Sequence, residues 1–140
     1  MIERGIFVVG TDTGIGKTFV SGALMAASHG TRYWKPLQTG PLEDHDTPWV
    51  KKHAQLPDAR IFDIGYRFAE PASPHYAAAL ESADIDLDWL CAQPKGATDE
   101  PWIVEGVGGL MVPIDTTYLL PELITRLNLP VVVVASTRLG

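Results

Sequence analysis

The chain has only one cysteine, Cys91, and no apolar run long enough to cross a bilayer. A single cysteine excludes an internal disulfide and fits a reducing compartment. Its position beside two large apolar residues indicates a small core residue of a helix rather than a nucleophile. The missing apolar run predicts no transmembrane helix, and the first residues lack the pattern of a signal peptide. We therefore expect a cytoplasmic protein.

Positive charge is also scarce: Lys and Arg total 11 against 17 Asp and Glu, which leaves a net charge of −6. This balance argues against nucleic acid or an anionic membrane as the main partner. The sequence contains no internal repeat and no low-complexity segment. What it does contain, 46% hydrophobic and 20% charged residues over 140 positions, is typical of one globular domain.

The most informative motif is the stretch 10–18, GTDTGIGKT, which lies between an apolar strand pattern at 6–9 and a helix pattern at 19–27. Strand, glycine-rich turn, Gly-Lys-Thr and helix form the layout of a phosphate-binding loop. Backbone N–H groups and the helix N-terminus can then hold an anion. Lys17 would reach the β- and γ-phosphates and the Thr18 hydroxyl would ligate Mg²⁺. The motif predicts that the chain binds a nucleoside triphosphate.

One position of this motif is irregular. The usual pattern places a glycine where this chain has Thr11, and Gly10 lies one residue earlier. The alternative is a Gly/Thr-rich surface turn that happens to hold a lysine. The flanking strand and helix favour the phosphate-binding loop, because that context is what the motif requires.

Strand and helix patterns alternate along the whole chain, which predicts an α/β fold of the P-loop NTPase type, with a mostly parallel sheet and helices on both faces. The segment 60–68 is expected to be an edge strand, and the helix at 46–55 is expected to have Asp46 or Thr47 as its N-cap. The other expected strands are 6–9, 32–34, 102–104 and 131–134, and the other expected helices are 19–27, 73–80, 87–92 and 121–127.

The last strand pattern, 131–134, consists of four valines. A strand that is apolar at every position is typical of an inner parallel strand covered on both faces. The sequence ends six residues later, with no crossover helix after the strand. We therefore expect residues 1–140 to form a single P-loop α/β domain that is incomplete at its C-terminus. Either the chain is a truncated version of a longer protein, or another segment or subunit completes it.

Ligands of open α/β sheets lie beyond the carboxyl ends of the strands. Glu105 follows one strand and is a candidate carboxylate ligand of Mg²⁺, or else only caps a turn. Lys35 follows another strand and could neutralise charge on a transferring phosphoryl group, or else be an exposed lysine. Asp44 and Asp46 could serve the metal or only cap a helix. The residues expected to meet in one crevice are Thr13, Lys17 and Thr18, then Lys35, Gln38 and Thr39, then Glu105 and the turn 106–109.

Four stretches occur in order: 10–18 (GTDTGIGKT), 35–40 (KPLQTG), 68–75 (FAEPASPH) and 104–113 (VEGVGGLMVP). Together they resemble the ATP-dependent dethiobiotin synthetases of biotin biosynthesis, over essentially the whole chain. The resemblance implies a cytoplasmic, homodimeric ligase that uses ATP and Mg²⁺. Such an enzyme closes the ring of dethiobiotin from 7,8-diaminononanoate and CO₂ through a carbamate and a carbamic–phosphoric anhydride, releasing ADP and phosphate.

The resemblance also implies roles for individual residues. Lys35 and Lys17 would be catalytic, and Thr39 and Thr13 would contact the substrate. Mg²⁺ would be held by Thr18, Asp46 and Glu105, with Asp44 as the alternative to Asp46. ATP would be bound by Gly14, Ile15, Gly16, Lys17, Thr18, Phe19, Asp46, Glu105, Gly106, Val107 and Gly108.

The resemblance has a limit. Family members continue past residues 138–140 with an asparagine-bearing segment that recognises adenine, so we expect this chain alone to bind ATP weakly and to turn over little. A second hypothesis is a partner-switching ATPase of the partition type, but such proteins carry a lysine early in the loop, where this chain has Asp12. A third, a cobyrinate-type amide synthetase, would need a glutaminase domain. A fourth is a nucleotide-binding fragment without turnover.

Overall fold

The computed structural model describes residues 4–95 and 99–138. Its main feature is a five-stranded sheet in the order β4-β2-β6-β1-β7, in which every pairing is parallel. The domain expected over 1–140 also includes residues 1–3, 96–98 and 139–140, which lie outside the described residues. The strands of this sheet are β1 (Gly5–Gly10), β2 (Arg32–Trp34), β4 (Ile61–Phe62), β6 (Trp102–Glu105) and β7 (Val131–Val134).

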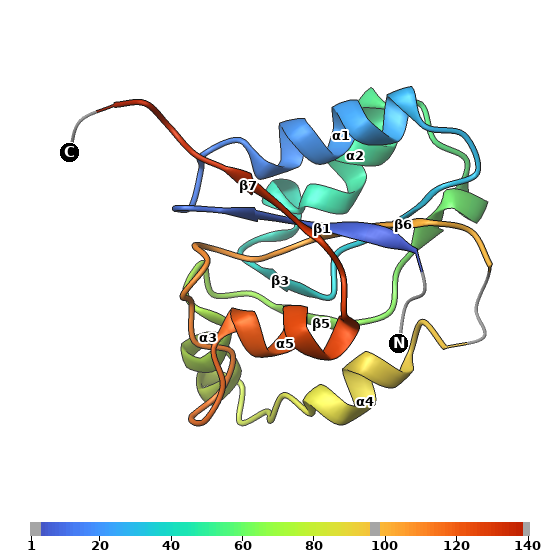
Figure 1. The fold of residues 1–140 in the computed structure, drawn as a ribbon. Helices are drawn as coiled ribbons and strands as arrows, with labels where there is room; N and C mark the ends of the chain where they lie inside the picture. Colours follow the sequence, from blue (N-terminus) through green and yellow to red (C-terminus); the bar gives the residue numbers. More distant parts are fainter. Residues whose placement is uncertain (1–3, 96–98, 139–140) are drawn as a thin grey trace.

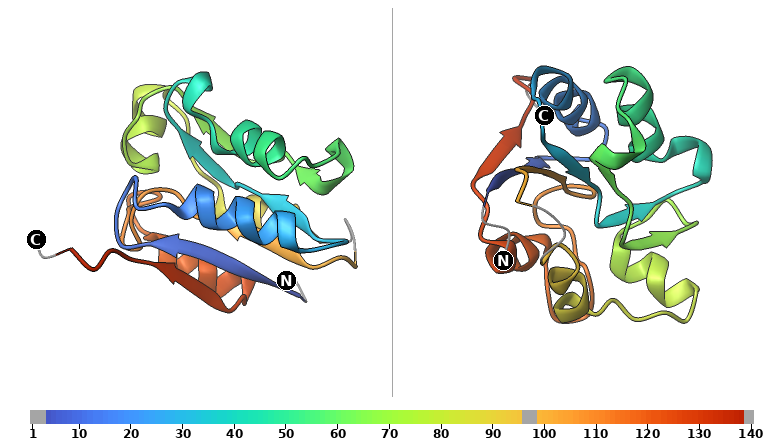
Figure 2. Two further views of the ribbon diagram at one scale, coloured as in Figure 1. Left: turned by 90° about the horizontal axis from the view of Figure 1, so that it is seen from above. Right: turned by 90° about the vertical axis from the view of Figure 1, so that its right-hand side faces the viewer.

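Helices cover both faces of this sheet. In Figure 1, α1 and α2 lie above it and α4 and α5 lie below it, and the two further views in Figure 2 show the same layers. A second sheet pairs β3 (Leu37–Thr39) with β5 (Tyr66–Phe68), and α3 packs against it. The helices are α1 (Lys17–Ala27), α2 (Asp46–His53), α3 (Pro74–Leu80), α4 (Leu87–Ala92) and α5 (Leu120–Leu127), with short 3-10 turns at η1 (Leu42–Asp44) and η2 (Asp58–Arg60).

The core divides into two layers because neighbouring strand residues point to opposite faces. Val8 packs on the α1 and α2 side, in a cluster that contains Met25 of α1 and Val50 of α2. Its neighbour Phe7 packs on the opposite side, in the cluster that contains Leu123 of α5. These layers confirm the expected fold class, a P-loop α/β domain with a parallel sheet between helices.

The strand expected at 131–134 is present as β7, and it is not covered on both sides by the described residues. β7 lies at the edge of the sheet, and β1 is its only partner there. Val131 is 43% exposed and Val133 is 53% exposed. Four consecutive valines therefore identified a strand correctly, and the expectation that a further segment or subunit covers it stays a prediction.

The segment 60–68 is not one edge strand. It begins in η2, continues as β4 at the edge of the main sheet, and then enters β5 of the second sheet. The chain crosses between the sheets at Gly65, where a Cβ atom would lie 2.2 Å from the carbonyl oxygen of Pro36. The amide of Tyr66 donates to that same carbonyl at 2.9 Å. The close approach of two backbones at Gly65 therefore divides the segment.

Helix α2 also differs from its prediction. It begins at Asp46 and ends at His53, and His45 is the N-cap, so neither Asp46 nor Thr47 caps it. The carboxylate of Asp46 instead contacts side chains outside the helix, as described below, while its amide donates to Gln38 Oε1 at 2.9 Å. Within the described ranges, no helix is long and apolar enough to span a membrane.

Candidate active site

The phosphate-binding loop leaves β1 and turns directly into α1. Gly14 has φ 70° and Gly16 has φ 111°, a left-handed conformation that glycine adopts without steric cost. Gly16 is the N-cap of α1, and no side chain caps the helix there. The first amides of α1 are therefore available to an anion, which the partial positive charge of the helix end would also favour. The local geometry matches what the motif predicts.

Lys17 is the first residue of α1, and its side chain is buried beneath the loop. Its ammonium group donates to the carbonyl oxygen of Asp12 at 3.1 Å. Burial and the nearby charge of Lys35 lower the pKa of Lys17 from its usual value, against the opposing effect of the carboxylates of Glu105 and Asp46. A phosphate anion at this position would remove much of that penalty.

Lys35 directly follows β2 and is only 2% exposed. Its Nζ atom lies 2.6 Å from Asp46 Oδ2, 3.2 Å from Glu105 Oε1 and 2.6 Å from the carbonyl oxygen of Gly106. Burial alone would lower the pKa of Lys35, but the charges of Glu105 and Asp46 outweigh it and raise that pKa. Lys35 is thus a buried cation that stays protonated, not the exposed lysine of the alternative interpretation.

Thr18 connects the loop to the same two carboxylates. Its Oγ1 lies 2.8 Å from Asp46 Oδ1 and 2.8 Å from Glu105 Oε1, and the single hydroxyl proton can serve only one of them at a time. Burial would raise the pKa of Asp46, yet the charge and hydrogen bond of Lys35 lower it below its usual value. Asp46 is therefore ionised at neutral pH.

These oxygens fit the chemistry of a magnesium site. Mg²⁺ takes oxygen ligands and commonly uses one or two carboxylates together with water and phosphate oxygens. Hydroxyl and carboxylate oxygens of Thr18, Asp46 and Glu105 converge here, one from each of three elements. Residues 4–95 and 99–138 contain no group of three or more His, Cys, Asp or Glu side chains arranged to hold a metal. A magnesium ion held by these oxygens would take its remaining ligands from water and phosphate oxygens.

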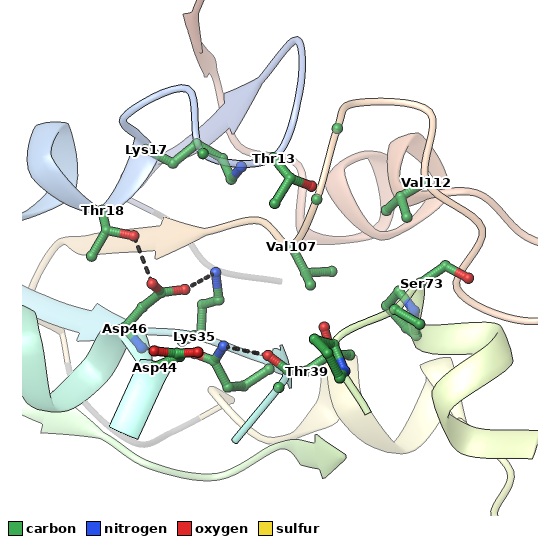
Figure 3. Close-up of a pocket in the computed structure, with 18 of the residues that line it drawn as sticks. Thr13, Lys17, Thr18, Lys35, Thr39, Asp44, Asp46, Ser73, Val107 and Val112 are labelled. Atoms are coloured by element: carbon green, nitrogen blue, oxygen red, sulfur yellow. Dashed lines mark hydrogen bonds and ion pairs between the residues drawn. The ribbon is translucent and has the colours of Figure 1, made fainter. Parts of the chain in front are cut away.

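A cavity of about 550 Å³ opens next to this cluster (Figure 3). Lys35, Asp46 and Thr18 lie on one side of it, and Ser73 and Val112 lie on the other. The structure thus brings the three strand-end sets together, as their positions in the sequence predict. The cavity is lined by Thr13, Gly14, Gly16, Lys17, Thr18, Lys35, Gln38, Thr39, Gly40, Asp44, Asp46, residues 71–74, Val107, Gly108, Gly109 and Val112.

Four of the expected ATP-binding residues do not line this cavity: Ile15, Phe19, Glu105 and Gly106. Phe19 is exposed and lines a second cavity of about 310 Å³ instead. Glu105 is 0% exposed and reaches the site through its contacts with Thr18 and Lys35. Asp44 lines both cavities, but it is Asp46 whose carboxylate contacts Lys35 and Thr18.

Two polar residues at the site had no assigned role in the sequence interpretation. Gln38 lines the cavity and ties the segment after β2 to the start of α2. Tyr33, within β2, donates its phenol to Glu105 Oε2 at 2.9 Å. Burial and the charge of Glu105 raise the pKa of Tyr33 well above its usual value, so it remains a donor. Strand alternation could have placed Tyr33 on the α1 side, but no pattern pairs it with a residue 72 positions away.

A family model described as an AAA domain matches residues 4–140. The chain belongs to this AAA-domain family. Several curated relatives are similar over nearly all of the chain. An ATP-dependent dethiobiotin synthetase BioD from Bradyrhizobium sp. (strain BTAi1 / ATCC BAA-1182) is 44% identical over 140 residues, all of this chain and 65% of the relative. A protein of the same name from Paramagnetospirillum magneticum is 47% identical over 98% of this chain and 64% of the relative.

A biotin biosynthesis bifunctional protein BioCD from Bordetella avium is 46% identical over 98% of this chain, which corresponds to 29% of that longer protein. This AAA-domain chain therefore spans somewhat less than two thirds of the length of the synthetases that it matches. The resemblance to dethiobiotin synthetases that the four motifs predict is confirmed as homology over the whole chain.

Proposed function

We propose that this AAA-domain chain performs the reaction of a dethiobiotin synthetase: closure of a ureido ring from 7,8-diaminononanoate, CO₂ and ATP. The observation that carries the proposal is the buried ammonium group of Lys35, which lies between the carboxylates of Asp46 and Glu105. Lys35 lines a cavity that residues of the phosphate-binding loop also line. The names of the similar proteins support the same reaction. In this proposal the protein acts as a cytoplasmic homodimer.

The phosphates of ATP would bind at the amides that begin α1, with Gly14 and Gly16 providing the left-handed turns and Lys17 the charge. Thr18, Asp46 and Glu105 would hold Mg²⁺, with Asp44 as a less well-placed alternative to Asp46. The chemistry that the bound ion supplies is neutralisation of phosphate charge. Main-chain groups of residues 105–108 would complete the nucleotide site next to Ile15 and Phe19.

Charge repulsion is the main obstacle to the first chemical step. The carbamate formed from one amine and CO₂ is an anion, and one of its oxygens must attack the γ-phosphorus of ATP while ADP leaves. Lys35 stays protonated because two carboxylates hold its proton, so it serves as a fixed cation and not as a base. A preorganised cation of this kind lowers the cost of bringing two anions together.

Ring closure follows when the second amine attacks the carbamoyl carbon of the anhydride and phosphate leaves. This step needs the diamine to be held so that both nitrogens lie close to Lys35. The hydroxyls of Thr39 and Thr13 line the cavity at positions suited to these polar groups. Val107, Val112 and Pro71 line it as well and provide apolar surface for the methylene chain.

The experiment that tests the proposal measures ADP release from ATP, Mg²⁺ and bicarbonate, with and without the diamine, together with dethiobiotin formation by mass spectrometry. For the complete protein we expect ADP release that depends on the diamine and a loss of about 100-fold or more in Lys35→Ala, the range found when a preorganised charge-stabilising group is removed. For residues 1–140 alone we expect weak ATP binding and little turnover. Lys51→Ala, which removes an exposed lysine paired with Asp58, is the matched control and should keep normal rates.

Three outcomes for the complete protein would contradict this function. Diamine-independent hydrolysis that Lys35→Ala leaves unchanged would exclude both the reaction and the role of Lys35. Hydrolysis that responds to a protein partner and not to the diamine would favour the partition-type ATPase. Nucleotide binding without any turnover would correspond to the fragment hypothesis.

A further inference from the structure

The carboxylate of Glu105 is fully buried, and both of its oxygens are engaged. Oε1 lies within hydrogen-bond distance of Thr18 and Lys35, at 2.8 and 3.2 Å. Oε2 accepts a hydrogen bond from the phenol of Tyr33 at 2.9 Å. Thr18 and Lys35 belong to the proposed phosphate and metal machinery, whereas Tyr33 does not line the cavity. The contact of Tyr33 with Glu105 therefore needs a separate explanation.

We propose that Tyr33 is a positioning residue that holds the Glu105 carboxylate in the orientation that binds magnesium. This inference rests on the proposed function only in so far as that function includes a magnesium–nucleotide complex held by Glu105. Tyr33 acts through Glu105: its phenol binds Oε2, which leaves Oε1 to Thr18 and Lys35. The partner of a metal-ligating carboxylate in this position fixes its rotation and tunes its affinity for the metal.

The burial of Tyr33 makes this contact well suited to fixing an orientation. Tyr33 is 0% exposed and lies in β2, with its ring packed in the cluster that contains Val8, Met25 and Ile103. A ring held on all sides cannot follow a carboxylate that rotates. Glu105 is equally confined, because it ends β6, the strand paired with β2. The two side chains therefore have one relative arrangement, fixed by the register of two neighbouring strands.

The consequence of losing the phenol follows from burial. Without the Tyr33 hydroxyl, Oε2 would lose its hydrogen-bond donor in a region closed to bulk water, which carries a free-energy cost for a buried acceptor. The carboxylate could recover part of this cost by turning Oε2 toward Lys35, which would move Oε1 away from Thr18. The expected result is weaker magnesium binding, with the loop and its direct phosphate contacts unchanged.

The experiment compares the affinity of the protein for ADP in Mg²⁺ and in EDTA by calorimetry, for wild type and Tyr33→Phe. We expect ADP affinity in EDTA to stay within about twofold, and the half-saturating Mg²⁺ concentration to rise about tenfold or more, as for other residues behind a metal ligand. Tyr76→Phe, at an exposed tyrosine of α3, is the matched control and should change neither quantity. Tyr33→Met, an apolar replacement that adapts to irregular packing, should show the same shift as Tyr33→Phe.

A double-mutant cycle with Glu105→Gln separates positioning from general loosening of the fold. If Tyr33 acts through the carboxylate, Tyr33→Phe should have little further effect on Mg²⁺ dependence in the Glu105→Gln background. An equal loss of ADP affinity in EDTA, an unchanged Mg²⁺ requirement, or a full effect that persists in that background would each overturn the proposal. The comparison is made within each variant, so a smaller folded fraction does not imitate the shift.

The same data separate this inference from the proposed function. Mg²⁺-dependent ADP binding that weakens in Tyr33→Phe, in a protein that forms no dethiobiotin, would exclude the ligase reaction and support the role of Tyr33. Dethiobiotin formation with an unchanged Mg²⁺ requirement in Tyr33→Phe would do the reverse. Wild-type protein that binds ADP equally well in Mg²⁺ and EDTA would overturn the role of Tyr33, and dethiobiotin formation would still decide the ligase reaction.

Discussion

Lys35 Nζ lies 2.6 Å from Asp46 Oδ2. This ion pair joins the residue that follows β2 to the first residue of α2. His45, and not Asp46, occupies the N-cap position, and the carboxylate of Asp46 contacts Lys35 and Thr18 instead of capping the helix. The residue that propensity would use to cap the helix is used to hold a buried cation instead. Three side chains compensate one another's charge in this small volume: Lys35, Asp46 and Glu105.

The stability of the protein should depend strongly on Lys35. Lys35→Met keeps the length of the side chain but leaves the carboxylates of Glu105 and Asp46 next to each other without a cation. Removing one partner of a buried ion pair costs about 3–5 kcal/mol, and urea unfolding followed by circular dichroism would measure it. Lys51→Met breaks only an exposed pair with Asp58 and should cost about 1 kcal/mol or less. Equal losses in the two variants would contradict this account.

The contribution of Asp46 to stability should depend on pH in a defined direction. Burial opposes its ionisation, but Lys35 outweighs burial, so the folded-state pKa of Asp46 lies below its ordinary value of 3.8. The stabilisation is therefore fully present above about pH 3.8 and is lost as the pH falls through the lower, folded-state pKa. The difference in unfolding free energy between wild type and Asp46→Asn should be constant from about pH 5 to 7, because this range lies about a unit or more above the ordinary pKa. The difference should shrink below about pH 4. A difference that grows toward acid pH would contradict this direction.

Gln38 should control the start of α2. Its Oε1 accepts from the amide of Asp46 at 2.9 Å, and its Nε2 donates to the carbonyl of Thr39 at 3.0 Å. Gln38→Ala removes both bonds, so we expect a loss of about 1–3 kcal/mol in unfolding free energy and a weaker Mg²⁺ dependence of ADP binding as Asp46 becomes less well placed. Gln93→Ala, at the exposed end of α4, removes one comparable bond to Trp89 and should leave ADP binding unchanged.

How far the sequence predicts this site depends on which residues are considered. Lys35 follows a strand, Glu105 ends one, and Lys17 lies on the loop–helix junction after another. The carboxyl ends of parallel strands must meet at one edge, so the proximity of these residues could be predicted. Asp46 is different, because its position depends on a contact with Gln38 across an irregular loop. Sequence spacing alone could not choose between Asp44 and Asp46 for this reason.

The errors in the fold have similar causes. The position of Asp46 in α2 is one case, because the contacts of its carboxylate with Lys35 and Thr18 replace the capping role that local propensity suggests. The segment 60–68 looks continuous, because the crossing at Gly65 is imposed by the carbonyl of Pro36, 29 residues earlier in the chain. Local propensity predicts elements well, but it does not predict which distant backbone an element will meet.

Gly65 itself provides a test. An added Cβ atom would lie 2.2 Å from the Pro36 carbonyl oxygen, and the backbone there has φ 159°. Backbone atoms cannot give way as a flexible side chain can, so we expect Gly65→Ala to cost at least about 3 kcal/mol. Gly30→Ala is the control, because Gly30 also has a positive φ of 68° but no neighbouring atom within 4 Å of the added carbon. Its cost should be about 1 kcal/mol, from the backbone conformation alone. Similar thermal unfolding temperatures for the two variants would argue against the close approach.

The buried hydroxyl of Ser21 should lower the unfolding free energy of the protein. Its side chain is fully buried in α1, and among the described residues its Oγ has no hydrogen-bond partner. Ser21→Ala removes a desolvated hydroxyl and introduces a better helix former, so the unfolding free energy should rise by about 1 kcal/mol. Ser28 is the matched contrast at the end of the same helix, because its Oγ contacts both Arg60 and the Met25 carbonyl. Ser28→Ala should therefore lower the unfolding free energy by about 1 kcal/mol. A Ser21→Ala variant as destabilised as Ser28→Ala would contradict this prediction. The hydroxyl of Ser21 would then have a hydrogen-bond partner in solution, and the packing of α1 on the sheet would have to leave room for that partner.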